Sequence, residues 1–228
     1  MTYNFLLLSF FCLIPGGVIY CIREDLRPVI HIMALCSIPF AFTERFFYLS
    51  YWEPVFLFDL VNTLGFGIED ILFVTGLSAF TSTVYAFCFR LGYVMEKGRT
   101  AFQIVCRCLT VFSLTFILVV IVVVLNIQMI YGSFGIMLGM GLFIVLLRKD
   151  LLVPGLAGGV LSMVVYSVPC FFLKWIFPDI FYLTWHTEKF LNLFIAGIPL
   201  EELIYGFAAG VIATVFYPFV FCMRFKPC

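Results

Sequence analysis

Seven apolar stretches, each long enough to cross a bilayer as a helix, constrain this chain more than any other feature. A helix of about 20 apolar residues spans the hydrocarbon core of a membrane. Hydrophobic residues make up 64% of the 228 and charged residues only 11%, against about 25% in soluble domains, so a water-soluble globular domain is excluded. We therefore predict an all-α polytopic membrane protein of about seven transmembrane helices, at residues 3–22, 29–49, 66–89, 102–126, 130–147, 152–176 and 193–221. In the last stretch, Pro199 is expected to open the regular part of the helix, because proline suits a first helical turn.

Lysine and arginine residues predict the orientation of these helices. Nine of the 13 fall in segments that an odd number of spans places on one side: Arg23, Arg27, Arg90, Lys97, Arg99, Arg148, Lys149, Arg224 and Lys226. Only three fall at the other ends of the helices: Arg45, Lys174 and Lys189. Because basic segments remain in the cytoplasm, the pattern predicts an integral protein of the cell membrane with its N-terminus outside and its C-terminus cytoplasmic.

The two halves of the sequence repeat each other. Arg23 and Asp25 recur as Arg148 and Asp150, Pro39 as Pro169, Trp52 as Trp185, the acidic pair 69–70 as 201–202, and Tyr85 as Tyr217. The matches occur in the same order, and the later ones keep an offset of 132 residues or one close to it. We predict two three-helix modules at residues 1–90 and 130–228, joined by a connecting helix within 91–129. The first module and the connecting helix together make four spans, an even number. The second module therefore enters the membrane from the same side as the first, and the two are expected to be parallel repeats.

Glycine spacing offers a smaller expectation about packing. Gly206 and Gly210, and likewise Gly135 and Gly139, lie four residues apart in predicted spans. Such pairs accompany close helix contacts in membranes, although glycine is also common in membrane helices without them. The spacing alone favours neither a close helix contact nor glycines without a packing role.

Several classes of site are excluded. The net charge is zero, so no excess of basic residues exists to bind nucleic acid. The nine cysteines are scattered, none forms a Cys-x-x-Cys pair, and only two histidines could join them, so we predict no metal site. The Gly-x-Gly element at 65–67 lacks the third glycine and the preceding strand of a dinucleotide site, so no cofactor is predicted.

Five carboxyl groups lie where an apolar chain has least reason to tolerate them: Glu44, Glu69, Asp70, Glu201 and Glu202. An acid at the centre of a span costs about 2.5–3.5 kcal/mol. A carboxylate in a first helical turn gains about 0.3–1 kcal/mol from the helix dipole, which explains one acid per helix but not two adjacent acids, twice. Clustered carboxyl groups in an apolar site cannot all stay ionised, and a neutral acid beside a carboxylate is equipment for acid–base chemistry.

Aromatic residues accompany these acids. Residues i and i+4 of a helix share a face, so Glu69 shares a face with Phe73, and Glu201 with Tyr205. Aromatic faces attract cations, by about 2 kcal/mol when desolvated, and together with strong acids they suit carbocation chemistry on a hydrocarbon. With 30 phenylalanines, however, most rings need only face lipid, and Trp52 and Trp185 could equally be interfacial residues.

At these residues the sequence resembles the lycopene cyclase domain family, integral-membrane carotenoid cyclases of bacteria, archaea and fungi. The family has two three-helix modules, each with a Pro-x-Glu-Glu type motif followed by aromatic residues. Residues 198–205 match this motif, whereas residues 66–73 carry Gly67 in place of the usual proline and Asp70 in place of the second glutamate. These departures weaken the inference that the substrate is lycopene, and leave the identity of the isoprenoid open.

The resemblance implies a redox-neutral cyclase, an intramolecular lyase or isomerase, that protonates a terminal double bond of a linear isoprenoid and deprotonates the ring cation. It makes Glu201 and Glu69 the leading acid and base, with Glu202 and Asp70 tuning or replacing them. Phe73 and Tyr205 would shield the cation, and the expected substrate contacts also include Glu44, Trp52 and Trp185. The expected partners are a hydrophobic isoprenoid and the lipid bilayer; homo-oligomerisation stays open.

Two other functions remain as alternatives. Parallel repeats with intramembrane carboxyls also fit a small proton-coupled transporter, and a non-catalytic membrane scaffold would need no chemistry at all. A retinal-binding photoreceptor is excluded, because it needs a lysine in the last span and none occurs between Lys189 and Lys226.

Overall fold

A computed structural model describes residues 3–96 and 98–227 and contains seven helical segments long and apolar enough to cross a membrane. They are Asn4–Ile22, Glu24–Phe47, Ile68–Cys88, Ala101–Val124, Met129–Leu147, Lys149–Ile176 and Leu200–Val220. The predicted all-α membrane fold with seven spans is therefore confirmed, and the span predicted at 152–176 agrees with helix α9, Leu152–Ile176.

The spans of the first half are α1 (Asn4–Ile22), α2 (Arg27–Ser37) and α5 (Ile68–Thr81), with continuations beyond α2 and α5. Pro39 interrupts the second span, because a proline lacks the N–H of a regular helix. The chain there becomes the 3₁₀ helix η2 (Ile38–Thr43) and the short α3 (Glu44–Phe47). The short segments of this half are η1 (Glu24–Leu26), η3 (Leu57–Asp59), α4 (Leu60–Leu64) and α6 (Val84–Cys88).

Long helices also make up the second half. They are α7 (Ala101–Val124), α8 (Met129–Leu147), α9 and α11 (Leu200–Val220). Regular helix begins after Pro199, as predicted, but residues 193–199 are not helical, because β2 (Phe194–Ile195) and β3 (Ile198–Pro199) form a short antiparallel pair. The remaining segments are η4 (Lys149–Leu151), α10 (Ile180–Leu183) and η5 (Thr187–Lys189).

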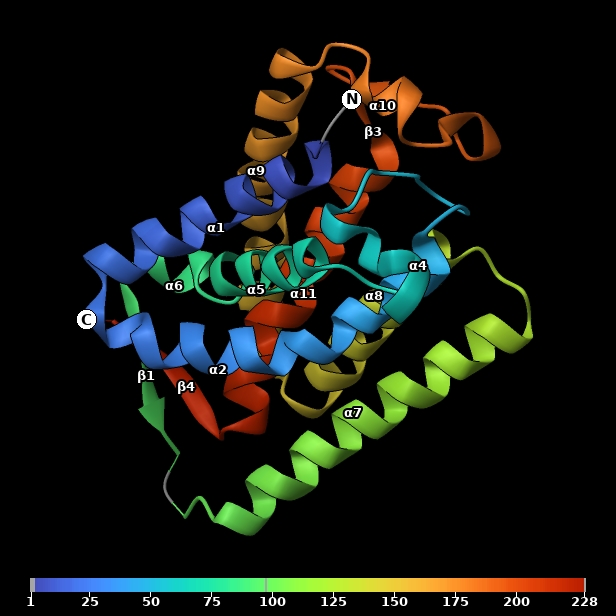
Figure 1. The fold of residues 1–228 in the computed structure, drawn as a ribbon. Coiled ribbons are helices and arrows are strands. Elements are labelled where there is room, and N and C mark those ends of the chain that lie inside the picture. Colours follow the sequence, from blue (N-terminus) through green and yellow to red (C-terminus); the bar gives the residue numbers. More distant parts are fainter. Residues whose placement is uncertain (1–2, 97, 228) are drawn as a thin grey trace.

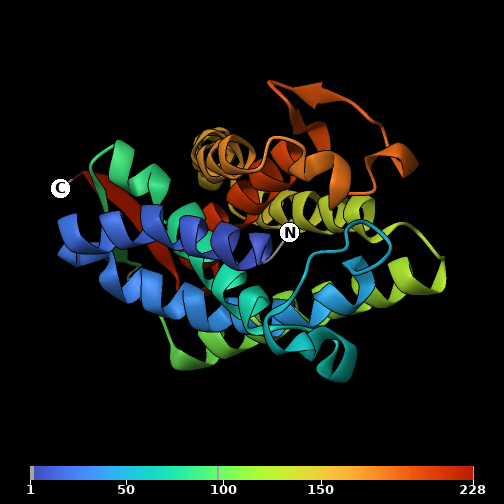
Figure 2. The ribbon, with the colours of Figure 1, turned by 45° about the horizontal axis from the view of Figure 1, so that its top comes forward.

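Helix α11 is the centre of the molecule and α7 its periphery. Of the spanning segment of α11, 78% is buried inside the protein, compared with 11% for α7. Helices α9 and α8 pack against α11, whereas α1 and α2 pack against α5 (Figure 1). Figure 2 shows these two groups, blue to teal and yellow to red, side by side. Contacts of α5 with α9 and α11, and of α1 with α9, join them.

Glycines allow α9 and α11 to approach closely. A side chain at Gly210 would meet Ser162 and the carbonyl oxygen of Gly158, the latter at 2.8 Å, and one at Gly206 would meet Tyr166. Nothing lies within 4 Å of the position that a Cβ would take at Gly135 or Gly139. The Gly206–Gly210 spacing therefore marks a close helix contact, and the Gly135–Gly139 spacing does not.

Equivalent arginines close one end of the molecule in both halves. Arg23 donates to the Asp25 carboxylate and, at 2.7 Å, to the carbonyl of Leu91 in β1 (Leu91–Met95). Arg148 donates to Asp150 and, at 3.2 Å, to the carbonyl of Met223 in β4 (Met223–Pro227). Strands β1 and β4 pair antiparallel. The repeated local contacts agree with the repeat in the sequence, while the module boundaries and the parallel arrangement of the modules stay predictions.

The α9–α11 contact can be tested with one substitution at two sites. We expect Gly210→Ala to lower the free energy of unfolding by about 1–3 kcal/mol, because the added methyl group has no space beside Ser162. Gly135→Ala, at an exposed helical position with open space, should be neutral or stabilising, since alanine favours helix by about 1 kcal/mol over glycine. Thermal unfolding of the two variants in detergent measures the difference, and equal midpoints would contradict the assigned contact.

Candidate functional site

Five carboxyl side chains are buried, and they are the ones that the sequence singled out. Their exposed fractions are 6% or less: Glu44, Glu69, Asp70, Glu201 and Glu202. Within residues 3–96 and 98–227, no lysine or arginine is buried to that degree. The carboxyl groups are therefore satisfied by neutral hydrogen-bond donors or by one another, because an unpaired buried charge is costly.

Glu69 and Glu201 each bind the loop that precedes their helix. The Glu69 Oε1 accepts a hydrogen bond from the backbone N–H of Leu57, and the Glu201 Oε1 accepts one from the N–H of Leu191 at 3.0 Å. The Oε2 of Glu69 is buried without a hydrogen-bond partner. Neither residue lines the cavity described below. Glu69 and Glu201 are therefore placed to fix the loops that lead into their helices.

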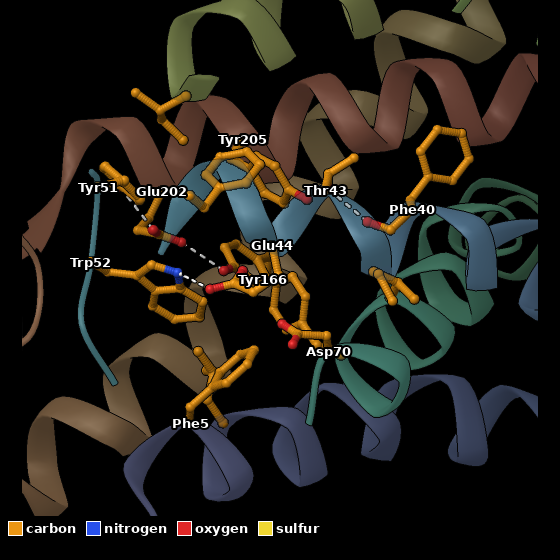
Figure 3. Close-up of a pocket in the computed structure, with 16 residues that line it drawn as sticks. Phe5, Phe40, Thr43, Glu44, Tyr51, Trp52, Asp70, Tyr166, Glu202 and Tyr205 are labelled. Atoms are coloured by element: carbon orange, nitrogen blue, oxygen red, sulfur yellow. Dashed lines mark hydrogen bonds between the residues drawn. The ribbon is translucent and has the colours of Figure 1, made fainter. Parts of the chain in front are cut away.

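The second acid of each pair, together with Glu44, faces a common cavity. This carboxyl cavity has a volume of about 60 Å³ and lies between the two groups of helices (Figure 3). Asp70 comes from the first turn of α5, Glu202 from the first turn of α11, and Glu44 from the first turn of α3. The tertiary structure thus brings three carboxyl groups together from segments far apart in the sequence.

Glu44 and Asp70 form a pair. The Glu44 Oε1 accepts a hydrogen bond from the indole Nε1 of Trp52 at 2.7 Å, and the Asp70 Oδ2 accepts one from the backbone N–H of Gly67 at 2.6 Å. Both side chains line the cavity and lie next to each other there (Figure 3). Two neighbouring carboxyl groups in an apolar site repel each other when both are ionised, so the arrangement suits a pair that shares one proton.

Glu202 has a different environment, made of three neutral donors. Its Oε1 accepts hydrogen bonds from the hydroxyl of Tyr51 at 2.9 Å and the indole Nε1 of Trp185 at 2.8 Å, and its Oε2 accepts one from the hydroxyl of Tyr166 at 2.6 Å. Hydrogen bonds donated to a carboxylate favour its charged form. The three donors therefore offset part of the cost of burying a carboxylate at Glu202.

Tyr51 and Tyr166 are functional candidates that the sequence reasoning missed. Burial and the neighbouring Glu202 hold the pKa of the Tyr51 phenol well above its usual range, so the phenol remains a donor. The position of Tyr51 next to Trp52, a predicted site residue, was a weak indication in the sequence that Tyr51 belongs to the site. Tyr166 is one aromatic residue among many in its span and had no such indication. Only the contact of α9 with α11 singles out Tyr166.

Aromatic rings form much of the cavity wall. Phe73 and Tyr205, both expected at the site, line it with their rings stacked at a centroid distance of 6.4 Å. Tyr166 approaches both rings, at 6.2 and 6.4 Å. Trp52 also lines the cavity, whereas Trp185 lies behind it, with its ring 5.1 Å from that of Trp52. The two tryptophans are thus hydrogen-bond donors to the carboxyl groups, in addition to their predicted role in substrate binding.

Metal ligands do not converge anywhere in the part of the chain that the structure describes: no three histidine, cysteine, aspartate or glutamate side chains are placed to hold an ion. Eight cysteines are free thiols, and Cys228 lies outside the described residues.

Residues 128–220 match the family model described as lycopene cyclase. The matched region contains α8, α9 and α11, and with them Glu201, Glu202 and Tyr166. Glu44, Trp52 and Asp70 lie outside it. No curated protein and no solved structure matches the chain.

Proposed function

We propose that this integral membrane protein, whose residues 128–220 match the lycopene cyclase family model, cyclises the end group of a linear isoprenoid of the carotenoid type. The reaction would be redox-neutral and internal to the substrate, as for an intramolecular lyase or isomerase. The observation that carries the proposal is the carboxyl cavity, where Glu44 and Asp70 lie beside each other and Glu202 accepts three hydrogen bonds from neutral donors, between aromatic rings.

The proton donor in this mechanism is the Glu44–Asp70 pair. Transfer of its proton to the terminal double bond of the substrate leaves a tertiary carbocation on the neighbouring carbon. The pair is then a carboxylate pair still bound by the indole of Trp52 and the N–H of Gly67, which stabilise the charge that develops on it.

Ring closure and loss of a proton follow. The internal double bond attacks the cation, a carbon–carbon bond forms, and the positive charge moves into the new ring. Glu202 removes a proton next to that charge, and the electrons of the broken C–H bond become the ring double bond. One proton enters the substrate and one leaves it, so the product has the composition of the substrate; transfer of the proton from Glu202 to the Glu44–Asp70 pair resets the site.

The aromatic walls of the cavity, and the lack of a buried lysine or arginine among the described residues, both favour a carbocation in the cavity. The faces of Phe73, Tyr166 and Tyr205 offer negative electrostatic potential to a carbocation, worth about 2 kcal/mol or more for a desolvated cation. A lysine or arginine at the wall would repel the cation, and none is buried in the described chain. The geometry favours Glu202 and Asp70 as the acids that would contact the substrate, because they line the cavity, whereas Glu201 and Glu69 accept backbone N–H groups from loops.

Paired substitutions test the assignment. We expect Asp70→Asn and Glu202→Gln each to lower the rate of cyclisation by about 10²–10⁴-fold, because each removes a titratable group from proton transfer. The neighbours provide matched controls: Glu69→Gln and Glu201→Gln keep an oxygen acceptor for the loop and should retain activity within about tenfold. The measurement is pigment analysis in cells that accumulate linear carotenoids. Loss of activity in the controls but not in Asp70→Asn and Glu202→Gln would contradict the assignment, and an unaltered pigment profile with the native chain would overturn the function.

Isotope incorporation tests the proton balance. With membranes equilibrated in D₂O, each ring formed should contain one deuterium, because the protons on the carboxyl groups exchange with solvent between turnovers and the departing proton comes from the substrate. In H₂O the mass of the product should equal that of the substrate. Mass spectrometry of the extracted product measures both, and a change of two hydrogens per ring would show redox chemistry instead.

The orientation predicted from the basic residues places the carboxyl cavity toward the outer side of the membrane. Arg23, Arg148 and Arg224 gather at the end of the molecule that strands β1 and β4 close, whereas α5 and α11 begin, with their acids, toward the opposite end. We expect a green fluorescent protein fused after residue 228 to fluoresce in a bacterial host, because it folds in the cytoplasm. An alkaline phosphatase fusion at the same position should be inactive; the reverse pattern would refute the orientation.

A further inference from the structure

A second and larger cavity adjoins the carboxyl cavity. It has a volume of about 200 Å³, more than three times the 60 Å³ of the carboxyl cavity, and we call it the apolar chamber. Its walls come from α2, η2, α3, α5, α7, α8 and α11. Five residues line both cavities: Phe40, Thr43, Phe47, Val74 and Tyr205. The two cavities therefore meet at a shared wall beside the reacting groups.

The apolar chamber offers hydrocarbon contacts and little else. Among the described residues, none that lines it is charged, and the oxygen-bearing side chains that line it are hydroxyls. Four of these hydroxyls donate to a backbone carbonyl three or four residues earlier: Ser37, Thr43, Thr81 and Ser133. The hydroxyl of Ser78 also lines the chamber and has no hydrogen-bond partner. Because four of the hydroxyls are already used and the rest of the wall is mostly apolar, the chamber favours a largely apolar occupant.

Helix α7 is the outer wall of the chamber. Val111, Phe112, Thr115 and Val119 of α7 line it, while most of the helix faces away from the protein. Figure 1 shows α7 along one edge of the molecule. The rings of Phe112 and Phe40 lie 6.1 Å apart, which links α7 to η2 across this wall. A peripheral helix thus forms one side of the chamber.

We propose that the apolar chamber binds the hydrocarbon chain that continues behind the reacting end group, and so selects long linear isoprenoids over short ones. This inference rests on the proposed cyclase function. The carboxyl cavity accommodates only the end that forms the ring, and the chain behind it must pass out of that cavity. The shared wall at Val74, Phe47 and Tyr205 provides a path into a larger space that has matching chemistry. The occupant would reach the chamber from the bilayer, where such a substrate is dissolved.

Two adjacent valines of α7 provide a matched test. Val119 lines the chamber, whereas Val120 is 43% exposed and faces away from it. We expect Val119→Phe to fill the chamber and to weaken binding of lycopene at least tenfold, while Val120→Phe leaves it within about twofold. Ala213→Leu, on the α11 wall of the chamber, is a second filling variant should Val119→Phe not fold.

The readout is binding rather than turnover. Lycopene is achiral, so a circular dichroism band in its visible absorption arises only when the polyene lies in a chiral site. The titration is made in nanodiscs on the Glu202→Gln background, which blocks turnover. Equal binding by folded Val119→Phe, Ala213→Leu and Val120→Phe would overturn the chamber assignment. Cyclisation by the native chain, measured separately, decides the proposed function, so the two failures are distinguishable.

Discussion

Burial of five carboxyl groups in a helical membrane protein, with no buried lysine or arginine among the described residues, is the constraint on which the rest of the structure depends. Each group requires donors that carry no charge. Glu202 obtains them from Tyr51, Tyr166 and Trp185, and Glu44 from Trp52. These donors belong to both halves of the chain, so satisfying the acids requires the two groups of helices to pack together.

The close contact of α9 with α11 serves the same arrangement. Gly206 leaves space for the ring of Tyr166, whose hydroxyl then reaches Glu202. A larger residue at 206 would displace the ring from its place beside the carboxylate. The completely buried Tyr166 therefore links the packing of α9 against α11 to the hydrogen bonding of Glu202.

Division of labour within each acidic pair follows from the geometry of a helix start. Adjacent residues point about 100° apart, so the two acids of a pair cannot face the same direction. Glu69 and Glu201 face the loops that lead into α5 and α11, and accept backbone N–H groups there. Asp70 and Glu202 face inward. The first acid of each pair shapes the loop over the cavity, and the second supplies a carboxyl group to it.

Sequence alone determined the number of spans, most of their bounds, and the set of buried acids, because apolar length and the cost of a charge in lipid are local properties. The family resemblance was confirmed for residues 128–220. The sequence could not determine which acid of each pair faces the cavity, or that Tyr51 and Tyr166 bind Glu202. Nor could it show that the Gly206–Gly210 spacing marks a helix contact while the Gly135–Gly139 spacing does not. Those outcomes depend on which helix faces lie against each other, and in a chain that is apolar on nearly every face only tertiary packing decides that.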